Sequence, residues 1–295
     1  MSALTVLSRP LVEVIRKRTS QRRYLPEWLA PELKRRLSQH LQALPTPPFA
    51  PACRFTLVEA TVGEARAART LGTYGAIHGA RQYIVGAVTR GTRDMENYGY
   101  LLEEIVLFAT DLGLGTCWLG GSFNRSGFAR AMGLRDEEWL PAISPVGPVS
   151  PTRSYSDRLL RWQVRSEHRK PWNELFFHDT PGNPATETSA GAYATVLEMV
   201  RLAPSASNRQ PWRILKEYNR PVFHIYLQRN PLYTAAAKTI LPSGDIQRLD
   251  IGIALYHFEG AAREAGLKGR WQVLDTVPPF PKAEYVVSWN GLTAK

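Results

Sequence analysis

The chain has few cysteines and no residue spacing typical of a metal site. Its 295 residues include two cysteines, Cys53 and Cys117, which lie in unrelated sequence contexts. Two isolated thiols argue against a disulfide framework and against a cysteine-bound metal cluster. The six histidines show no ligand pattern such as H-E-x-x-H, so we expect no metal ion. This cysteine usage is typical of a reducing cytoplasm, where we expect the protein to work.

Long apolar runs are also missing. No stretch approaches the roughly 20 apolar residues that cross a membrane, so we expect no membrane association. The basic residues 1–24 lack the long apolar segment of a secretory signal, and we expect none. The apolar fraction of 44% is nevertheless ordinary, which allows one large core or two smaller ones.

Acidic residues are outnumbered by basic ones. The chain has 26 Asp and Glu against 37 Lys and Arg, a formal net charge of +11. Such a balance can indicate nucleic-acid binding, but the basic residues are spread along the chain without a zinc finger, RNP motif or basic tail. The dense cluster at residues 16–23 suits a compact anionic ligand better than a duplex. We therefore expect no nucleic-acid partner, and a basic nucleic-acid binder is the less favoured alternative.

Two segments of the chain repeat each other at an offset of 153 positions. Each copy reads as an amphipathic helix that stops at a glycine and is followed by Leu-x-x-x-Trp. This pattern predicts two repeats, residues 1–160 and 161–295, that form a fused pseudo-dimer within a monomer. The identical positions are Gly99, Leu102, Ala109, Gly113, Leu114 and Trp118, which meet Gly252, Leu255, Ala262, Gly266, Leu267 and Trp271.

The periodicity within each copy predicts an α+β fold. We expect linker-like segments at residues 148–168 and 178–190, which are rich in Pro, Ser, Thr and Gly. The expected helices are 10–17, 31–44, 61–70, 99–112, 193–202 and 249–265, and the expected strands are 54–59, 83–88, 141–146, 212–217, 223–227 and 284–288.

A basic element follows the first expected helix. Arg18 and Arg22 flank Ser20, so two guanidiniums and a hydroxyl lie close together. A phosphate monoester carries nearly two charges and three acceptor oxygens, which match Arg donors well. The alternative is a solvated basic helix end, favoured by the helix dipole.

A rigid corner at residues 203–212 is the second candidate element. Pro204 ends the expected helix before it, because proline disfavours helical geometry in the preceding residue. Ser205, Asn208 and Gln210 then follow in a short, amide-rich run. Such a corner can present polar groups to a flat, polar-edged ligand, or it can simply stabilise a helix–strand junction.

Together these two elements resemble those of the FMN-dependent nitroreductases. Residues 203–212 match the A-P-S-x-x-N-x-Q-P-W signature of that family, and residues 18–22 match its R-x-S-x-[RK] element. The resemblance is closest to the two-repeat branch with one FMN per chain. It implies a nitroreductase-like fold, with a central, mainly antiparallel sheet flanked by helices. It also implies that FMN is held by Arg18, Thr19, Ser20, Arg22, Pro204, Ser205, Ala206, Asn208 and Gln210.

The resemblance extends to further cofactor-binding candidates. It implies that the backbone amides of Leu119, Gly120 and Gly121, next to Trp118, face the flavin ring. Thr73 and Arg169 are additional candidates for contacts with the pyrimidine and the phosphate. Ser207 stands where the family commonly has Gly, which requires a left-handed backbone from a serine. Trp118 has the alternative role of a core residue, and Cys117 is expected to pack rather than react.

The two intact elements lie in different repeats. Repeat one keeps residues 18–22, but its counterpart of the second element is the divergent Leu44–Phe49 stretch, residues 44–49. Repeat two keeps residues 203–212, but its counterpart of the first element, residues 169–173, lacks the serine. We therefore expect one complete flavin site per chain.

The resemblance implies an NAD(P)H oxidoreductase that reduces nitroaromatics, quinones or similar planar acceptors. No side chain stands out as a catalytic acid or base, because the flavin performs the chemistry. A flavin-binding storage or redox-sensing protein without robust turnover is the alternative. The sequence leaves open the acceptor, the choice between NADH and NADPH, and further oligomerisation.

Overall fold

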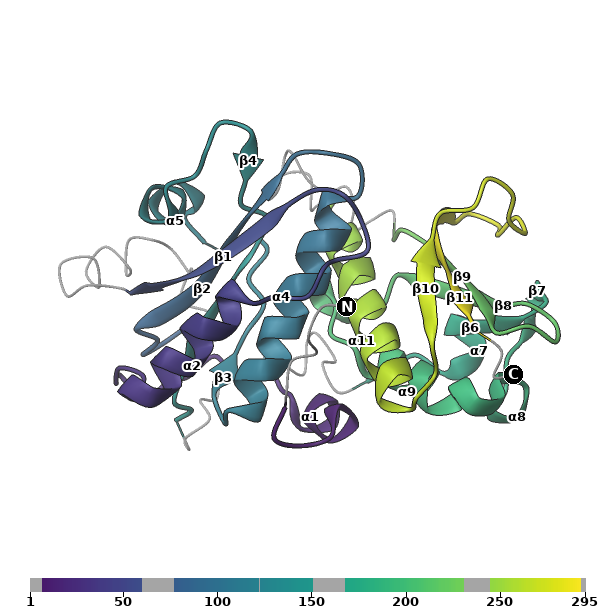
Figure 1. Cartoon of the computed structure of the whole chain (residues 1–295), viewed down its shortest axis with the longest axis horizontal. Coiled ribbons are helices and arrows are strands. Elements are labelled where there is room, and N and C mark those ends of the chain that lie inside the picture. The colour runs from purple at the N-terminus through teal and green to yellow at the C-terminus, as the bar shows by residue number, and fades with distance from the viewer. Residues whose placement is uncertain (1–6, 60–76, 122, 151–167, 231–244, 293–295) are drawn as a thin grey trace.

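The computed structural model describes residues 7–59, 77–121, 123–150, 168–230 and 245–292. Two long helices, α4 (Asp94–Asp111) and α11 (Ile246–Glu264), pack against each other at the centre of the molecule. Figure 1 shows one sheet on each side of this pair. Both helices are buried along nearly their whole length, which explains why each carries apolar residues around its whole circumference and not along one stripe.

The first sheet belongs to repeat one and is entirely antiparallel. Its order is β1-β2-β5-β3, and β4 pairs with the free end of β2. The strands are β1 (Cys53–Glu59), β2 (Gln82–Thr89), β3 (Gly115–Thr116), β4 (Glu138–Trp139) and β5 (Ile143–Gly147).

Helices cover both faces of this sheet. Ile84 and Val88 of β2 join the main core with α4 and α2 (Pro31–Gln42), whereas Val85 and Ala87 join a smaller core with α5 (Arg125–Met132). Successive side chains of a strand point to opposite faces, so β2 is apolar throughout because both of its faces are buried.

The second sheet belongs to repeat two and has the order β10-β11-β9-β8-β6-β7. The pair β6–β8 is parallel, and the other neighbours are antiparallel. The strands are β6 (Phe176–His178), β7 (Thr180–Pro184), β8 (Trp212–Lys216), β9 (Val222–Leu227), β10 (Gly269–Gln272) and β11 (Glu284–Gly291).

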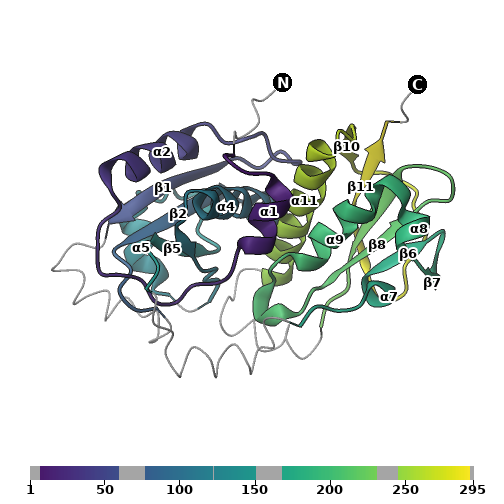
Figure 2. The ribbon, with the colours of Figure 1, turned by 90° about the horizontal axis from the view of Figure 1, so that it is seen from below.

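Shorter helices complete the fold. Helix α1 (Leu11–Lys17) contacts α4, α11 and α9 (Ala194–Leu202), so repeat one reaches across to repeat two (Figure 2). Two four-residue helices, α7 (Trp172–Leu175) and α8 (Glu187–Ala190), flank the second sheet. Short 3₁₀ turns lie at Gly191–Tyr193 and Ala206–Asn208. Among the described residues, no helix combines the length and apolarity needed to cross a bilayer.

The α+β prediction and the internal duplication are confirmed, with one sheet in each repeat. The linker prediction for residues 178–190 is wrong, because this segment forms β7 and α8. The Thr186 side chain caps α8 through a bond from the Ser189 amide, and Phe177 of β6 pairs with Pro184 of β7. The predicted helix at 61–70 and the predicted repeat boundary at 160/161 lie outside the described residues.

Candidate functional site

A cavity of about 360 Å³ lies between the two repeats. This volume is within the range of small-ligand sites, roughly 300–1,000 Å³. Repeat one contributes one wall, and α11 with the loop after α9 contributes the other. The lining residues are Arg18, Thr19, Ser20, Arg22, Cys117, Trp118, Gly120, Arg169, Leu202, Pro204, Ser205, Ala206, Ser207, Asn208, Ile246, Leu249, Asp250 and Ile253.

The basic element of repeat one lines the cavity as an extended segment directly after α1. Arg18 is the C-cap residue directly after α1, and its amide donates to Val14 O at 2.9 Å. Ser20 then forms a parallel bridge with Thr116, and the Gln21 amide donates to Thr116 O at 2.8 Å. The edge of the first sheet therefore sets the position of residues 18–22.

Arg169 of repeat two lines the same cavity as Arg18. Its guanidinium donates from Nη1 to Asn208 Oδ1 at 3.1 Å and from Nη2 to Leu202 O at 3.2 Å. Burial is the main cause that lowers the pKa of Arg169 to about 10, and the positive charges of Arg18 and Arg201 contribute to the same shift. An anion between Arg18 and Arg169 would offset this repulsion, since opposite charges within a few ångströms favour the charged form.

The loop after α9 is held in an uncommon backbone conformation. Ser207, Asn208 and Gln210 have φ angles of 48°, 55° and 49°. Positive φ is unfavourable for residues with a Cβ, and such residues cluster at functional sites. Ser207 thus adopts the left-handed conformation that its position in the signature predicts.

A network of hydrogen bonds holds this loop. The Gln210 amide donates to Ser205 Oγ at 2.9 Å, and the Ala206 amide donates to Asp250 Oδ1 at 2.9 Å. The Gln210 side chain accepts from the Lys170 amide at 2.9 Å and donates to Asn208 O at 3.1 Å. Gln210 is 2% exposed and does not line the cavity, so it supports the loop that the ligand would touch.

Trp118 and Gly120 line the cavity, but their neighbour Leu119 does not. The Trp118 indole donates to Glu103 Oε2 at 2.7 Å, which ties it to α4. The Leu119 amide, expected to face the flavin, donates instead to Ile143 O at 2.9 Å. Leu119 is therefore not a donor to a ligand in this arrangement. Gly121 follows the lining residue Gly120 but is not itself part of the lining, and Thr73 lies outside the described residues.

Sequence reasoning missed the contribution of α11. Ile246, Leu249 and Ile253 form an apolar part of the wall, and Asp250 lies among them. Their spacing of three and four residues places them on one face of a helix. Apolar residues are distributed around the whole helix, so its sequence alone does not say which face meets a ligand. The available signal for Asp250 was the alignment of the repeats. At the offset of 153, a carboxyl at Asp250 replaces the amide of Asn97 in repeat one.

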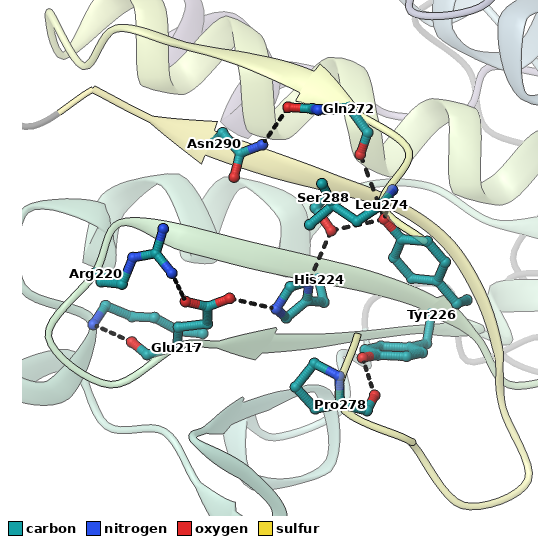
Figure 3. Close-up of polar contacts among 11 residues, drawn as sticks. Glu217, Arg220, His224, Tyr226, Gln272, Leu274, Pro278, Ser288 and Asn290 are labelled. Carbon is teal, nitrogen blue, oxygen red and sulfur yellow. Dashed lines mark hydrogen bonds and ion pairs between the residues drawn. The ribbon is translucent and has the colours of Figure 1, made fainter. Parts of the chain in front are cut away.

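A second polar cluster lies away from this cavity, in the second sheet (Figure 3). His224 contacts Ser288 Oγ through Nδ1 at 2.7 Å and Glu217 Oε1 through Nε2 at 3.1 Å. The order Ser–His–Glu resembles a hydrolytic triad. Ser288 and His224 are 0% and 1% exposed, however, so a substrate cannot reach the hydroxyl. This cluster stabilises the sheet.

The fold and this cavity define a nitroreductase-like protein built from two repeats. A family model described as "Putative TM nitroreductase" matches residues 10–262, and the chain belongs to this family. Membership of this family identifies the chain as an oxidoreductase. No curated protein sequence matches the chain significantly.

Solved structures match either nearly the whole chain or about half of it. A nitroreductase from Thermotoga maritima is 20% identical, covers 97% of this chain and 96% of its own, and has a TM-score of 0.59. This likeness shows the shared fold over nearly the whole chain. A nitroreductase in complex with FMN from Desulfovibrio desulfuricans is 24% identical, with 52% of this chain and 96% of its own covered and a TM-score of 0.39. A protein from Bacteroides thetaiotaomicron, named an NADH dehydrogenase/NAD(P)H nitroreductase, is 18% identical, with 50% and 94% covered and a TM-score of 0.39.

Proposed function

We propose that this chain is an FMN-dependent NAD(P)H oxidoreductase that reduces nitroaromatics, quinones or similar planar acceptors. One observation carries the proposal: the basic element at residues 18–22 of repeat one and the loop at residues 204–208 of repeat two line the same cavity. Nearly two hundred positions of sequence separate these elements, yet each resembles one part of the same flavin site.

The chemistry of the lining fits FMN. Arg18, Ser20, Arg22 and Arg169 supply charge and donors for a phosphate dianion, with Arg169 drawn from the other repeat. The apolar residues of α11 suit the face of a tricyclic ring, and the loop at 204–208 supplies polar groups for its edge. Burial and the neighbouring charges of Arg18 and Arg201 together lower the pKa of Arg169, and the proximity of these like charges supports an anionic ligand at this end of the cavity.

The residues of the chain bind and orient the cofactor. When bound, FMN would supply the two-electron chemistry between NADH or NADPH and the acceptor. Arg18 and Arg169 would hold the phosphate, and Ser20 would add a hydroxyl donor. Trp118 and α11 would exclude water from the ring, and the strained loop would fix its orientation. Gln210 would act indirectly, because it holds the loop in place without touching the cofactor.

We propose a single flavin site per chain. In repeat one, the counterpart of the flavin loop is residues 44–49, and the Phe49 amide donates to Asn97 Oδ1 at 2.9 Å. Arg169, the counterpart of Arg18, contributes to the first cavity. Both counterpart elements are therefore used in other ways, which supports one FMN and a pseudo-dimeric monomer.

Two measurements test this function. The purified chain should release about one FMN, quantified by absorbance after denaturation; two FMN per chain would contradict the single-site assignment. Anaerobic addition of NADH or NADPH should bleach the flavin absorbance band, and the faster of the two identifies the donor. A yellow protein that neither nucleotide reduces would favour flavin storage or sensing instead. A colourless protein that binds nucleic acid with steep salt dependence would favour the basic-binder alternative.

A further inference from the structure

Asp250 is a buried acid in the wall of the cavity. It lies near the start of α11, is 2% exposed and lines the cavity beside Leu249 and Ile253. Its Oδ1 accepts a hydrogen bond from the Ala206 amide at 2.9 Å. Its Oδ2 is buried and has no hydrogen-bond partner among the described residues. A buried polar atom without a hydrogen-bond partner is uncommon in folded proteins, and a bound ligand would supply one.

The duplication supplies a natural comparison at the same place in the fold. Asn97 of α4 corresponds to Asp250 at the offset of 153 and is 0% exposed. Its Oδ1 accepts from the Phe49 amide at 2.9 Å, and its Nδ2 donates to Phe49 O at 2.6 Å and to Pro51 O at 2.9 Å. Both side chains thus hold the loop of their own repeat.

The two positions differ in whether every polar atom of the side chain has a hydrogen-bond partner. Where the loop has diverged, the Asn97 amide uses both of its donors and its acceptor on loop backbone. Where the flavin loop is intact, Asp250 accepts a hydrogen bond from the loop with Oδ1, and its Oδ2 has no partner among the described residues. The extra oxygen therefore occurs on the side of the molecule where a cavity adjoins the residue.

The surroundings of Asp250 favour its neutral form. Burial holds the pKa of Asp250 well above its ordinary value, although the Ala206 amide lowers it, and the Asp245 carboxylate raises it further. Two cations at the start of α11 are engaged elsewhere: Arg248 of the helix pairs with Glu96 and Glu284, and Arg229, which follows β9, pairs with the N-cap residue Asp245. Arg18, Arg22 and Arg169 line the same cavity and are the cations of its phosphate end. A neutral carboxyl has an O–H donor where a carboxylate has none.

We propose that Asp250 is a neutral acid whose Oδ2–H donates a hydrogen bond to the flavin ring bound in this cavity. This role rests on the proposed function, and it assigns Asp250 as a further cofactor-contacting residue beside the two sequence elements. A donor at the polar edge of the ring stabilises the electron-rich reduced form more than the oxidised form. Asp250 would then both hold the loop, through Oδ1, and raise the flavin potential, through Oδ2.

The test compares Asp250→Asn with Asp250→Leu in the full chain, with Asn97→Leu as the matched control in repeat one. Asparagine keeps an acceptor for Ala206 and a neutral donor, whereas leucine has neither. The measured quantities are the FMN dissociation constants of the oxidised and the reduced flavin. We expect Asp250→Leu to change their ratio about tenfold in favour of the oxidised form, or about 30 mV for a two-electron couple. Asp250→Asn and Asn97→Leu should retain the wild-type ratio.

The possible failures are distinguishable. Wild-type protein that takes up no FMN would overturn the proposed function, and the role of Asp250 with it. Wild-type protein that binds FMN, together with an unchanged ratio in Asp250→Leu, would overturn the role of Asp250 alone. If Asp250→Asn instead bound both redox forms about tenfold more tightly, Asp250 would be an ionised group that repels the phosphate, contrary to the proposal. If Asp250→Leu does not fold, a shifted ratio in Asp250→Asn would overturn the proposal.

Discussion

Gly99 of α4 and Gly252 of α11 lie against each other's helix where the two long helices cross. A Cβ on Gly99 would overlap Leu249 O, and a Cβ on Gly252 would overlap Glu96 O. Leu249 and Glu96 are themselves 153 positions apart, so each glycine meets the equivalent carbonyl of the other repeat. The crossing is therefore symmetric, as at a homodimer interface.

The first prediction concerns this crossing. Gly252→Ala should lower the free energy of unfolding by about 1–3 kcal/mol, because overpacked backbone must shift to admit a methyl group. Chemical denaturation with urea measures the change. Gly182→Ala is the matched control, since a Cβ at Gly182 meets nothing within 4 Å. Equal stability of the two variants would contradict the close approach of the helices.

The second prediction concerns the phosphate end of the cavity. Arg18→Ala and Arg169→Ala should each weaken FMN binding at least about tenfold, the loss expected for a charge-assisted hydrogen bond. Arg169 comes from the other repeat, yet it lines the same cavity as Arg18. FMN fluorescence quenching gives the dissociation constants. The control is Arg35→Ala, at an exposed arginine that pairs with Glu32 on α2.

A loss in Arg18→Ala together with unchanged binding in Arg169→Ala would mean that repeat one holds the phosphate alone. Unchanged binding in both variants would contradict the assignment of this end of the cavity. High salt should weaken FMN binding in the wild type, because the contacts are ionic and partly exposed to solvent.

The fold was predictable where its pattern is local. Helix α9 and strands β8 and β9 follow from apolar periodicity and from the break at Pro204, and they form within a residue or so of the expected bounds. Strand β7 was missed because Pro181, Gly182 and Pro184 favour a loop. Its pairing with β6 is a tertiary contact that local sequence does not encode.

The site was predictable where backbone chemistry demands particular residues. The motifs at 18–22 and 204–208 line one cavity, as the resemblance implies. Gln210 and Leu119 carry the pattern of the family, yet they bond within the protein, and sequence spacing does not separate a ligand contact from a supporting one. The α11 wall was missed because a helix with apolar residues on every side gives no signal for the face that meets a ligand.

The third prediction addresses the strained loop. At Ser207, with φ of 48°, a β-branched side chain is strongly disfavoured, whereas glycine has no Cβ to clash. Ser207→Val should therefore cost about 1–2 kcal/mol of stability and weaken FMN binding, and Ser207→Gly should retain both. Thermal unfolding and FMN titration measure the pair. Equal FMN affinity in the two variants would show that the left-handed backbone is dispensable for the site.

The last prediction concerns the buried cluster around His224. Glu217 Oε1 only accepts, so His224 Nε2 carries the proton and Nδ1 accepts from Ser288 Oγ, which in turn accepts from the Tyr285 hydroxyl. Burial lowers the pKa of His224 below its ordinary value of 6.5, and Arg220 lowers it as well, against the raising effect of Glu217. The folded protein therefore binds this proton less readily than the unfolded chain.

The sign of the pH effect follows from that difference. The stabilisation is present above about pH 6.5 and is lost as the pH falls through the lower pKa of the folded state. Wild-type stability should drop between about pH 7.5 and about pH 5.5, and His224→Gln should drop less, because glutamine does not titrate. At the higher pH, His224→Gln should itself cost about 1 kcal/mol for the altered hydrogen bonds. Urea denaturation at both pH values is the measurement, with His78→Gln as the control at an exposed histidine. A drop in His224→Gln as large as in the wild type would assign the pH dependence to groups other than His224.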